Sequence, residues 1–200
     1  MASWRSVLKK VATRLALHPF WADYLAGLPE SRRGLHLIAL GEPAFSEVLF
    51  GVRDFEMRQL RSDRPPFESI GRGDVILVKR RGGPISGVVR VRRAWMFTGL
   101  TPDDWSRLSS ALSSRSVSGV SGDGFNPDDR TRFALVKLAN TVTLPVPVEY
   151  KNGHKPGWTV LKSPRSPIGS RRYVSPTDIR ALNGPRAARH LKGEEQGAHT

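Results

Sequence analysis

The chain has 200 residues, a formal net charge of +14 and no cysteine. The lack of cysteine excludes disulfides, thiolate metal sites and a cysteine nucleophile, and no apolar run reaches the roughly 18 residues of a membrane-spanning helix. The charge favours a polyanionic partner, with nucleic acid ahead of an anionic membrane.

The basic excess is concentrated at the two ends of the chain. Residues 1–34 carry a net charge of +4, residues 35–150 carry +3, and residues 151–200 carry +7. A nearly balanced middle is typical of an ordinary folded domain. We therefore expect an N-terminal helical extension over 1–34, one folded domain over 35–162, and a basic, mostly disordered tail over 163–200.

The first segment predicts a basic amphipathic helix over 4–16 and a shorter helix over 20–28. The apolar residues of the first helix recur at helical spacing and are Trp4, Val7, Leu8, Val11 and Leu15. We expect this stripe to pack on the outside of the domain, rather than to act as a membrane anchor or transit peptide. An apolar signal-peptide core is missing, which favours a cytoplasmic location.

The middle segment alternates apolar runs with glycine- and proline-rich turns, a pattern that predicts strands. We expect strands over 35–40, 54–60, 74–81, 87–97 and 132–148, with 158–161 closing the sheet. Helices are expected over 43–51 and 101–112, the second starting at Thr101-Pro102-Asp103-Asp104. The predicted class is mixed α+β and mainly β, a small β-barrel decorated by short helices.

Residues 51–58, Gly-Val-Arg-Asp-Phe-Glu-Met-Arg, carry the clearest chemical signal. In a strand, the charged side chains at 54, 56 and 58 face one side and the apolar ones at 55 and 57 the other. Gly51 permits a tight turn from the preceding helix, which places Arg53 at the mouth of a cleft. The plainer interpretation is an edge strand with solvated charges.

Four of these residues resemble a known motif. Gly51, Arg53, Glu56 and Arg58 are similar to the G-x-K-x-x-E-x-R motif of the ASCH domain family, a branch of the PUA-like superfamily. The resemblance implies a five- or six-stranded PUA-like barrel with a cleft between helix and barrel, lined by the charged groups of the motif. It also implies RNA binding, which is the expected role of most members.

Two further segments extend the resemblance over residues 35–162. The turn at 71–74, Gly-Arg-Gly-Asp, is similar to the family's x-G-D-x-I turn, and the strand starting at Gly87 to its G-x-V strand. Some small bacterial relatives hydrolyse RNA or acylated nucleosides, with a motif lysine in catalysis. Here Arg53 takes the place of that lysine, and a guanidinium stays protonated and cannot act as a base or amine nucleophile.

We therefore expect a nucleic-acid-binding module that binds RNA, or a modified or flipped base, in the cleft lined by this motif, with RNA favoured over DNA. The alternative is a small metal-independent ribonuclease or nucleoside amidohydrolase, in which Glu56 is the candidate catalytic residue. Glu56 lies between two cations and is expected to stay ionised, as an acceptor and orienter. The predicted nucleic-acid-binding residues are Gly51, Arg53, Glu56, Arg58, Lys79, Arg90, Arg92, Arg93 and Trp95.

Other chemistry has little support in the sequence. Trp95 alternates with arginines and is expected either to stack on a base or to belong to the core. The five histidines are scattered without ligand spacing, so neither metal nor cofactor is expected. His36 lies in an apolar strand and is expected to be a buried, hydrogen-bonded histidine rather than a base. A third interpretation is a protein-interaction module with a basic tail.

Overall fold

The computed structural model describes residues 3–60, 65–66, 69–113, 132–150 and 157–164. Within them the chain forms α1 (Trp4–Arg14), α2 (Trp21–Ala26), β1 (Leu35–Leu40), α3 (Ala44–Leu49), β2 (Phe55–Leu60), β3 (Val75–Arg80), β4 (Ile85–Thr98), α4 (Pro102–Ser113), β5 (Arg132–Val148) and β6 (Trp158–Lys162). The expected basic tail lies, from residue 165 on, outside the described residues.

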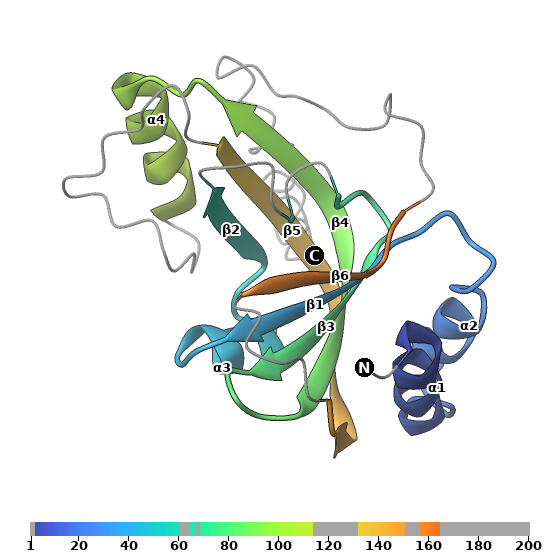
Figure 1. Ribbon diagram of the computed structural model, residues 1–200. Coiled ribbons are helices and arrows are strands. Elements are labelled where there is room, and N and C mark those ends of the chain that lie inside the picture. Colours follow the sequence, from blue (N-terminus) through green and yellow to red (C-terminus); the bar gives the residue numbers. More distant parts are fainter. Residues whose placement is uncertain (1–2, 61–64, 67–68, 114–131, 151–156, 165–200) are drawn as a thin grey trace, which may run out of the picture.

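The six strands form a single curled sheet in the order β2-β5-β4-β3-β1-β6 (Figure 1). β1 runs parallel to β3, and every other pairing is antiparallel. The long central strands β4 and β5 shift register at three places, and such bulges bend a strand and increase its twist. The bending brings β6 across the open side of the sheet (Figure 1).

Both faces of the sheet are covered by apolar side chains. An inner cluster draws on all strands except β2 and packs against α3; it includes Ile38, Ile76, Val89, Val136 and Trp158. On the outer face, α1 and α2 pack over an N-terminal cluster that includes Val11, Trp21, Leu35 and Val88. Farther along the outer face, α4 covers an aromatic cluster built around Phe55, Trp95, Phe97, Trp105 and Phe133.

The mixed α+β, mainly β fold expected from the sequence is confirmed, as a half-barrel. Predicted and observed strands agree to within about two residues, and β1 coincides with its predicted range. The N-terminal helices pack against the outside of the sheet, as expected. In the described part of the chain, β2 and β6 remain the two edges of the sheet, so the barrel is open between them.

Local sequence explains how the helices begin. Ser3 caps α1, and its hydroxyl accepts a hydrogen bond from the backbone N–H of Arg5. Before α4, the hydroxyl of Thr101 accepts from the backbone N–H of Asp104, while the Asp104 carboxylate accepts from the backbone N–H of Thr101. This reciprocal pair satisfies two donors that a helix start otherwise leaves unpaired.

Candidate nucleic-acid interface

The motif begins where α3 passes into β2. Gly51 has a φ of +72°, in the left-handed region that glycine adopts without a steric penalty. The turn returns the backbone N–H of Arg53 to the carbonyl oxygen of Glu47, at 3.0 Å. The end of the helix and the start of the strand are thus joined by a hydrogen bond, and Arg53 enters the protein at that joint.

Side chains along β2 alternate as the sequence predicted. Phe55 and Met57 enter the aromatic cluster under α4. Glu56 lies opposite Val136 of β5, and that valine belongs to the inner cluster. Directly opposite residues of paired strands share one face, so Glu56 and Arg58 face the inside of the half-barrel.

The charged side of β2 is more deeply buried than either sequence interpretation required. Arg53 and Glu56 are each only 2% exposed, whereas the side chain of Arg58 is 26% exposed. The interpretation of an edge strand with solvated charges is therefore wrong for Arg53 and Glu56. The reason is the curl of the sheet, which turns the inner face of β2 towards α3 and β6 instead of towards water.

Three side chains form a linked ionic group, which we call the Arg53–Glu56–Arg58 cluster. Arg53 Nη2 lies 2.7 Å from Glu56 Oε2, and Arg58 Nε lies 2.8 Å from Glu56 Oε1. Arg53 also donates from Nε to the carbonyl oxygen of Phe55 at 3.0 Å, and its Nη1 lies 3.8 Å from a carboxylate oxygen of Glu47. One guanidinium thereby serves a backbone carbonyl and two carboxylates.

Burial raises the pKa of Glu56 above its ordinary value, against the opposing attraction of Arg58 and then Arg53. Burial and the two cations therefore act on this carboxyl group in opposite directions, because removal from water disfavours the charged form. The geometry nevertheless suits a carboxylate. Each Glu56 oxygen faces a guanidinium, which only donates hydrogen bonds.

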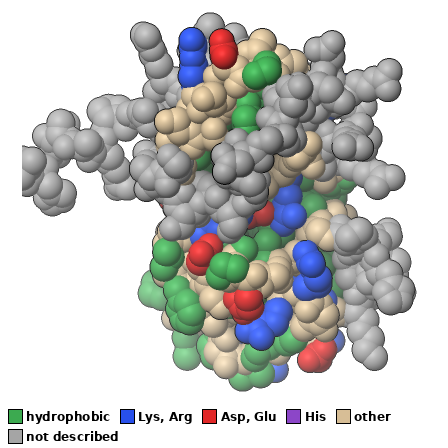
Figure 2. Space-filling model, turned by 90° about the vertical axis from the view of Figure 1, so that its left-hand side faces the viewer, with side chains coloured by type: hydrophobic (Ala, Val, Ile, Leu, Met, Phe, Trp, Pro, Cys, Tyr) green, Lys and Arg blue, Asp and Glu red, His purple; other side chains and the backbone are tan. Residues whose placement is uncertain are grey.

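Arg58 extends from this cluster towards the opposite edge of the sheet. Its Nη1 lies 3.9 Å from the position that a Cβ on Gly157 would occupy, directly before β6. Glu56 engages Nε, so the Nη1 end of the guanidinium lies where the edges of β2 and β6 approach each other. Figure 2 shows this side of the molecule, where basic, acidic and hydrophobic side chains are interspersed.

The structure does not bring all the predicted residues to this place. Lys79 is buried, and its ammonium donates a hydrogen bond to the carbonyl oxygen of Tyr150 at 3.1 Å. Trp95 is also buried and stacks on Phe55, with ring centroids 6.2 Å apart. Of the two roles considered for Trp95, the structure places it in the core. Gly51 is exposed at the turn.

The three predicted arginines of β4 lie apart from Arg58. The bulges of β4 interrupt the alternation of side chains between the two faces of the sheet near Arg92, and Arg92 is exposed. The guanidinium of Arg93 lies 5.7 Å from the ring centre of Trp95, on the outer face of the sheet. Arg90 is on the outer face too, beside α2.

Sequence reasoning missed several partners. Glu47 lies in α3 and contacts Arg53 because the turn at Gly51 brings the helix and the strand together. No pattern in the nearby residues predicts this contact. Arg33 and Tyr24 also went unnoticed, although the guanidinium of Arg33 lies 4.0 Å from the centre of the Tyr24 ring. The sequence predicted a helix over 20–28 but gave no sign of this cationic partner.

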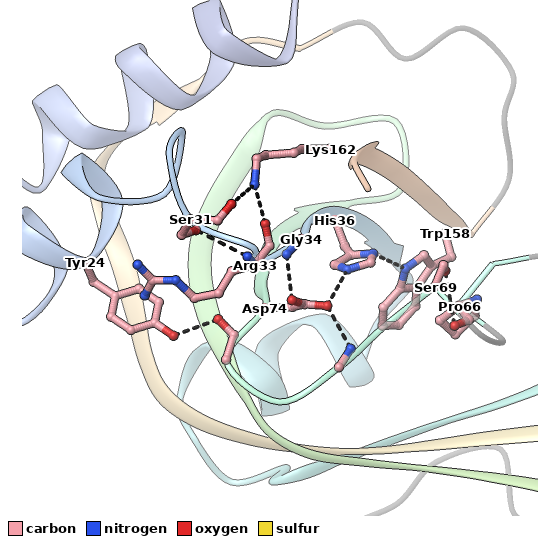
Figure 3. Close-up of polar contacts among 12 residues, drawn as sticks. Tyr24, Ser31, Arg33, Gly34, His36, Pro66, Ser69, Asp74, Trp158 and Lys162 are labelled. Atoms are coloured by element: carbon pink, nitrogen blue, oxygen red, sulfur yellow. Dashed lines mark hydrogen bonds and ion pairs between the residues drawn. The ribbon is translucent and has the colours of Figure 1, made fainter. Parts of the chain in front are cut away.

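A buried polar chain links β1, β6 and the turn before β3 (Figure 3). Asp74 accepts hydrogen bonds from the backbone N–H groups of Gly34 at 2.6 Å and Gly71 at 2.7 Å. Trp158 donates its indole N–H to Nδ1 of His36, so Nε2 of His36 carries the hydrogen and donates to Asp74 at 3.1 Å. Both ring nitrogens are occupied, as expected of a buried structural histidine.

Among the residues that the structure describes, no helix is long and apolar enough to cross a membrane. The same residues contain no group of three histidine or carboxylate side chains arranged as ligands of a metal ion.

Comparison with known proteins finds similarity at the level of structure. No family model and no curated protein matches the chain. The crystal structure of the ASCH protein of Zymomonas mobilis is 12% identical, covers 66% of this chain and 90% of its own, and gives a TM-score of 0.46. Two mutants of that protein give TM-scores of 0.45 and 0.43 at 11% and 12% identity; they cover 68% and 66% of this chain and 93% and 94% of their own.

These structures bear the ASCH name, the family that the motif at 51–58 resembles. Their identities of 11–12% and TM-scores below 0.5 are too low to support a functional argument. The function proposed below therefore rests on the geometry of the chain itself.

Proposed function

We propose that the chain is a nucleic-acid-binding module that takes RNA where the β2 and β6 edges approach, with Arg58 as the contacting residue. One observation carries the proposal: a partly exposed guanidinium is held through its Nε by a buried carboxylate, which a second, buried arginine fixes in turn. A planar donor fork oriented in this way suits a phosphate or the acceptor edge of a base.

In this proposal Arg53 and Glu56 are positioning residues. Arg53 is buried, and its contacts to the Phe55 carbonyl, Glu56 and Glu47 use Nε and both terminal nitrogens. An ammonium group is a compact charge without this planar geometry. The need for a fork accounts for arginine at the position where the family motif has lysine, and it supports binding rather than a lysine-dependent reaction.

The net charge of +14 supplies the long-range attraction that such a module needs. Binding of phosphates by lysine and arginine releases counterions, so affinity should fall steeply as salt rises. Deletion of residues 163–200 should weaken binding to all RNA sequences alike, because dispersed tail charges contact phosphates and read no bases. A deletion that leaves affinity unchanged at every salt concentration would assign the tail another purpose.

The experiment that tests the site is fluorescence anisotropy of the full chain with labelled 20-nucleotide poly(A), poly(U) and poly(C) RNA. Arg58→Gln should reduce the preference among the three by about 1–3 kcal/mol, the value of one bidentate base contact. Arg80→Gln is the matched control, since Arg80 is an exposed arginine paired with Glu42. Absence of RNA binding by the wild type at 50 mM salt would refute the proposal.

A second candidate function follows from the raised pKa of Glu56. Carboxyl groups with a raised pKa in a cleft often serve as general acids or bases. A metal-independent ribonuclease or nucleoside amidohydrolase would use Glu56 in this way. Cleavage of the same RNAs in the presence of a chelator, abolished by Glu56→Gln and retained by Arg80→Gln, would establish the enzyme in place of the binder.

A further inference from the structure

A second pair of arginines lies between α2 and the sheet, stacked on aromatic rings. The guanidinium carbon of Arg33 is 4.0 Å from the centre of the Tyr24 ring, and that of Arg90 is 5.2 Å from Phe20 and 5.9 Å from Tyr24. The Phe20 and Tyr24 rings stack on each other with centroids 5.0 Å apart. We call these four residues the arginine–aromatic cluster; Figure 3 shows its Arg33 and Tyr24.

Hydrogen bonds from neighbouring segments hold this cluster in place. The Tyr24 hydroxyl donates to the carbonyl oxygen of Gly73 at 2.6 Å, which fixes the ring against the turn before β3. The ammonium of Lys162 donates to the carbonyl oxygens of Ser31 and Arg33, at 2.8 and 2.5 Å. The Tyr24 ring and the backbone at Arg33 are therefore fixed by the protein itself, which lowers the cost of ordering them on binding.

No carboxylate neutralises this cluster within the described part of the chain. The ion pairs found there involve His36, Arg53, Arg58 and Arg80, and neither Arg33 nor Arg90 takes part in one. The Nε of Arg90 is buried and finds no hydrogen-bond acceptor among the described residues. A guanidinium over an aromatic ring keeps its full charge, and its N–H groups point outward in its own plane, where they can donate to an oxyanion.

We infer that Arg33 and Arg90 form a phosphate-binding site for the backbone of the RNA strand whose bases are read at Arg58; this inference rests on the proposed function. Two exposed arginines adjoin the pair: Arg32 precedes Arg33, and Arg72 precedes Gly73, the acceptor of the Tyr24 hydroxyl. A row of cations fits a polyanionic strand better than a single phosphate ion.

Strand β6 joins the two sites. It starts after Gly157, which lies beside Arg58, and ends at Lys162, which holds the backbone of Arg33. The five residue-to-residue steps from Gly157 to Lys162 span roughly 17 Å at about 3.3 Å per residue. This length matches about five nucleotides of a stacked strand at ~3.4 Å per nucleotide. One RNA strand running along the β6 edge therefore reaches both sites.

The test measures the salt dependence of binding of the full chain to a labelled 12-nucleotide single-stranded RNA. Each of Arg33→Gln and Arg90→Gln should lower the slope of log affinity against log salt by about 0.7, the value for one phosphate on a single strand. Between 50 and 200 mM salt, the wild type should then lose about 7-fold more affinity than the double variant. Preference among bases should not change.

The matched control is the double variant Arg80→Gln/Arg107→Gln, which removes two exposed charges from other parts of the surface. A slope for Arg33→Gln/Arg90→Gln equal to that of this control overturns the inference. A readout on the intact wild type avoids any effect of substitution on folding: the side-chain Nε–Hε NMR signals of Arg33 and Arg90 should shift when RNA is added, and that of Arg107 should stay. Signals of Arg33 and Arg90 that do not move also overturn it.

The experiments distinguish a failure of this inference from a failure of the proposed function. If wild type binds and Arg58→Gln loses base preference while the slope of the Arg33→Gln/Arg90→Gln variant matches the control, only the second site is refuted. If wild type does not bind RNA at 50 mM salt, both are refuted.

Discussion

The Arg53–Glu56–Arg58 cluster and the arginine–aromatic cluster use the same cation in opposite ways. In the first, two guanidiniums lie 2.7 and 2.8 Å from one buried carboxylate. In the second, two guanidiniums lie 4.0–5.9 Å from aromatic ring centres and have no carboxylate partner among the described residues. A carboxylate offsets the charge that it orients, whereas a ring orients the guanidinium and leaves its charge for a ligand.

The two clusters are suited to different roles, structural support in the first and ligand contact in the second. Arg53 is enclosed and has polar partners on Nε and both terminal nitrogens, so its contribution is to hold Glu56 and the α3–β2 joint. Arg33 and Arg90 are partly exposed, and neither forms an ion pair with a described residue. We therefore expect substitutions in the first cluster to be measured mainly as lost stability, and substitutions in the second mainly as lost affinity for RNA.

Glu56→Ala should produce the largest effect, a loss of about 3–5 kcal/mol in the free energy of unfolding, because it leaves the buried Arg53 without its main counter-ion. Urea denaturation followed by circular dichroism measures it. Glu42→Ala removes an exposed carboxylate that also pairs with an arginine, and little change is expected there. A loss in Glu56→Ala as small as in Glu42→Ala would mean that Arg53 does not depend on Glu56.

Arg53→Lys should cost about 1.5–3 kcal/mol, the value of one hydrogen bond involving a charged group. Lysine keeps the charge but lacks the planar fork that reaches the Phe55 carbonyl and Glu56 together. The same denaturation experiment measures this loss, with Arg80→Lys as the control. Stability equal to wild type would show that charge alone is needed at position 53.

Arg90→Met should change stability by less than about 1 kcal/mol. The substitution gives up a cation–π contact of about 0.5–1 kcal/mol, but it also removes a buried Nε that lacks an acceptor. Thermal and urea unfolding measure the change, while the RNA salt slope should fall as it does for Arg90→Gln. A large loss of stability here would make the second cluster structural like the first.

The smallest effect is a dependence on pH, because burial and the two arginines act on Glu56 in opposite directions. The pKa of Glu56 is raised by folding above the ordinary value of 4.5, so the folded protein binds this proton more tightly than the unfolded chain. Its contribution to stability is fully present below that value and is lost as pH rises through the folded pKa. The stability of wild type minus that of Glu56→Gln should therefore fall as pH rises from 4 to 8.

Urea titrations of both proteins at a series of pH values give this difference directly. A difference that grows with pH would mean that the ion pairs with Arg58 and Arg53 outweigh burial, and would reverse the direction assigned to the Glu56 pKa.

The elements of the fold could be predicted because their signals are local. Apolar runs bounded by glycine and proline marked β1 and β3, and Thr101 and Asp104 marked the start of α4. The alternation of side chains in β2 was also predicted, because it follows from strand geometry alone.

The burial of Arg53 and Glu56 could not be predicted in the same way. It depends on the bulges of β4 and β5 that curl the sheet, and on pairing of β2 with a strand more than seventy residues later in the chain. The arginine–aromatic cluster depends likewise on how α2 docks against β4. Neither the register of distant strands nor the docking of a helix leaves a pattern in the residues nearby.

The strand order also governs when this protein is able to fold during synthesis. β1 is made early, but the edge of β1 that faces away from β3 pairs with β6, which is made last of the six strands. β2 likewise cannot pair until β5 has been made. At a ribosomal rate of about 5–20 residues per second, residues 41–157 take on the order of 10 s to emerge. For that time the nascent chain presents the unpaired backbone of Leu35–Leu40, a short apolar edge open to pairing with other chains. Trp158 to Lys162 is therefore the last strand to cover that edge, and a chain that stalls before it is made leaves Leu35–Leu40 unpaired on that side.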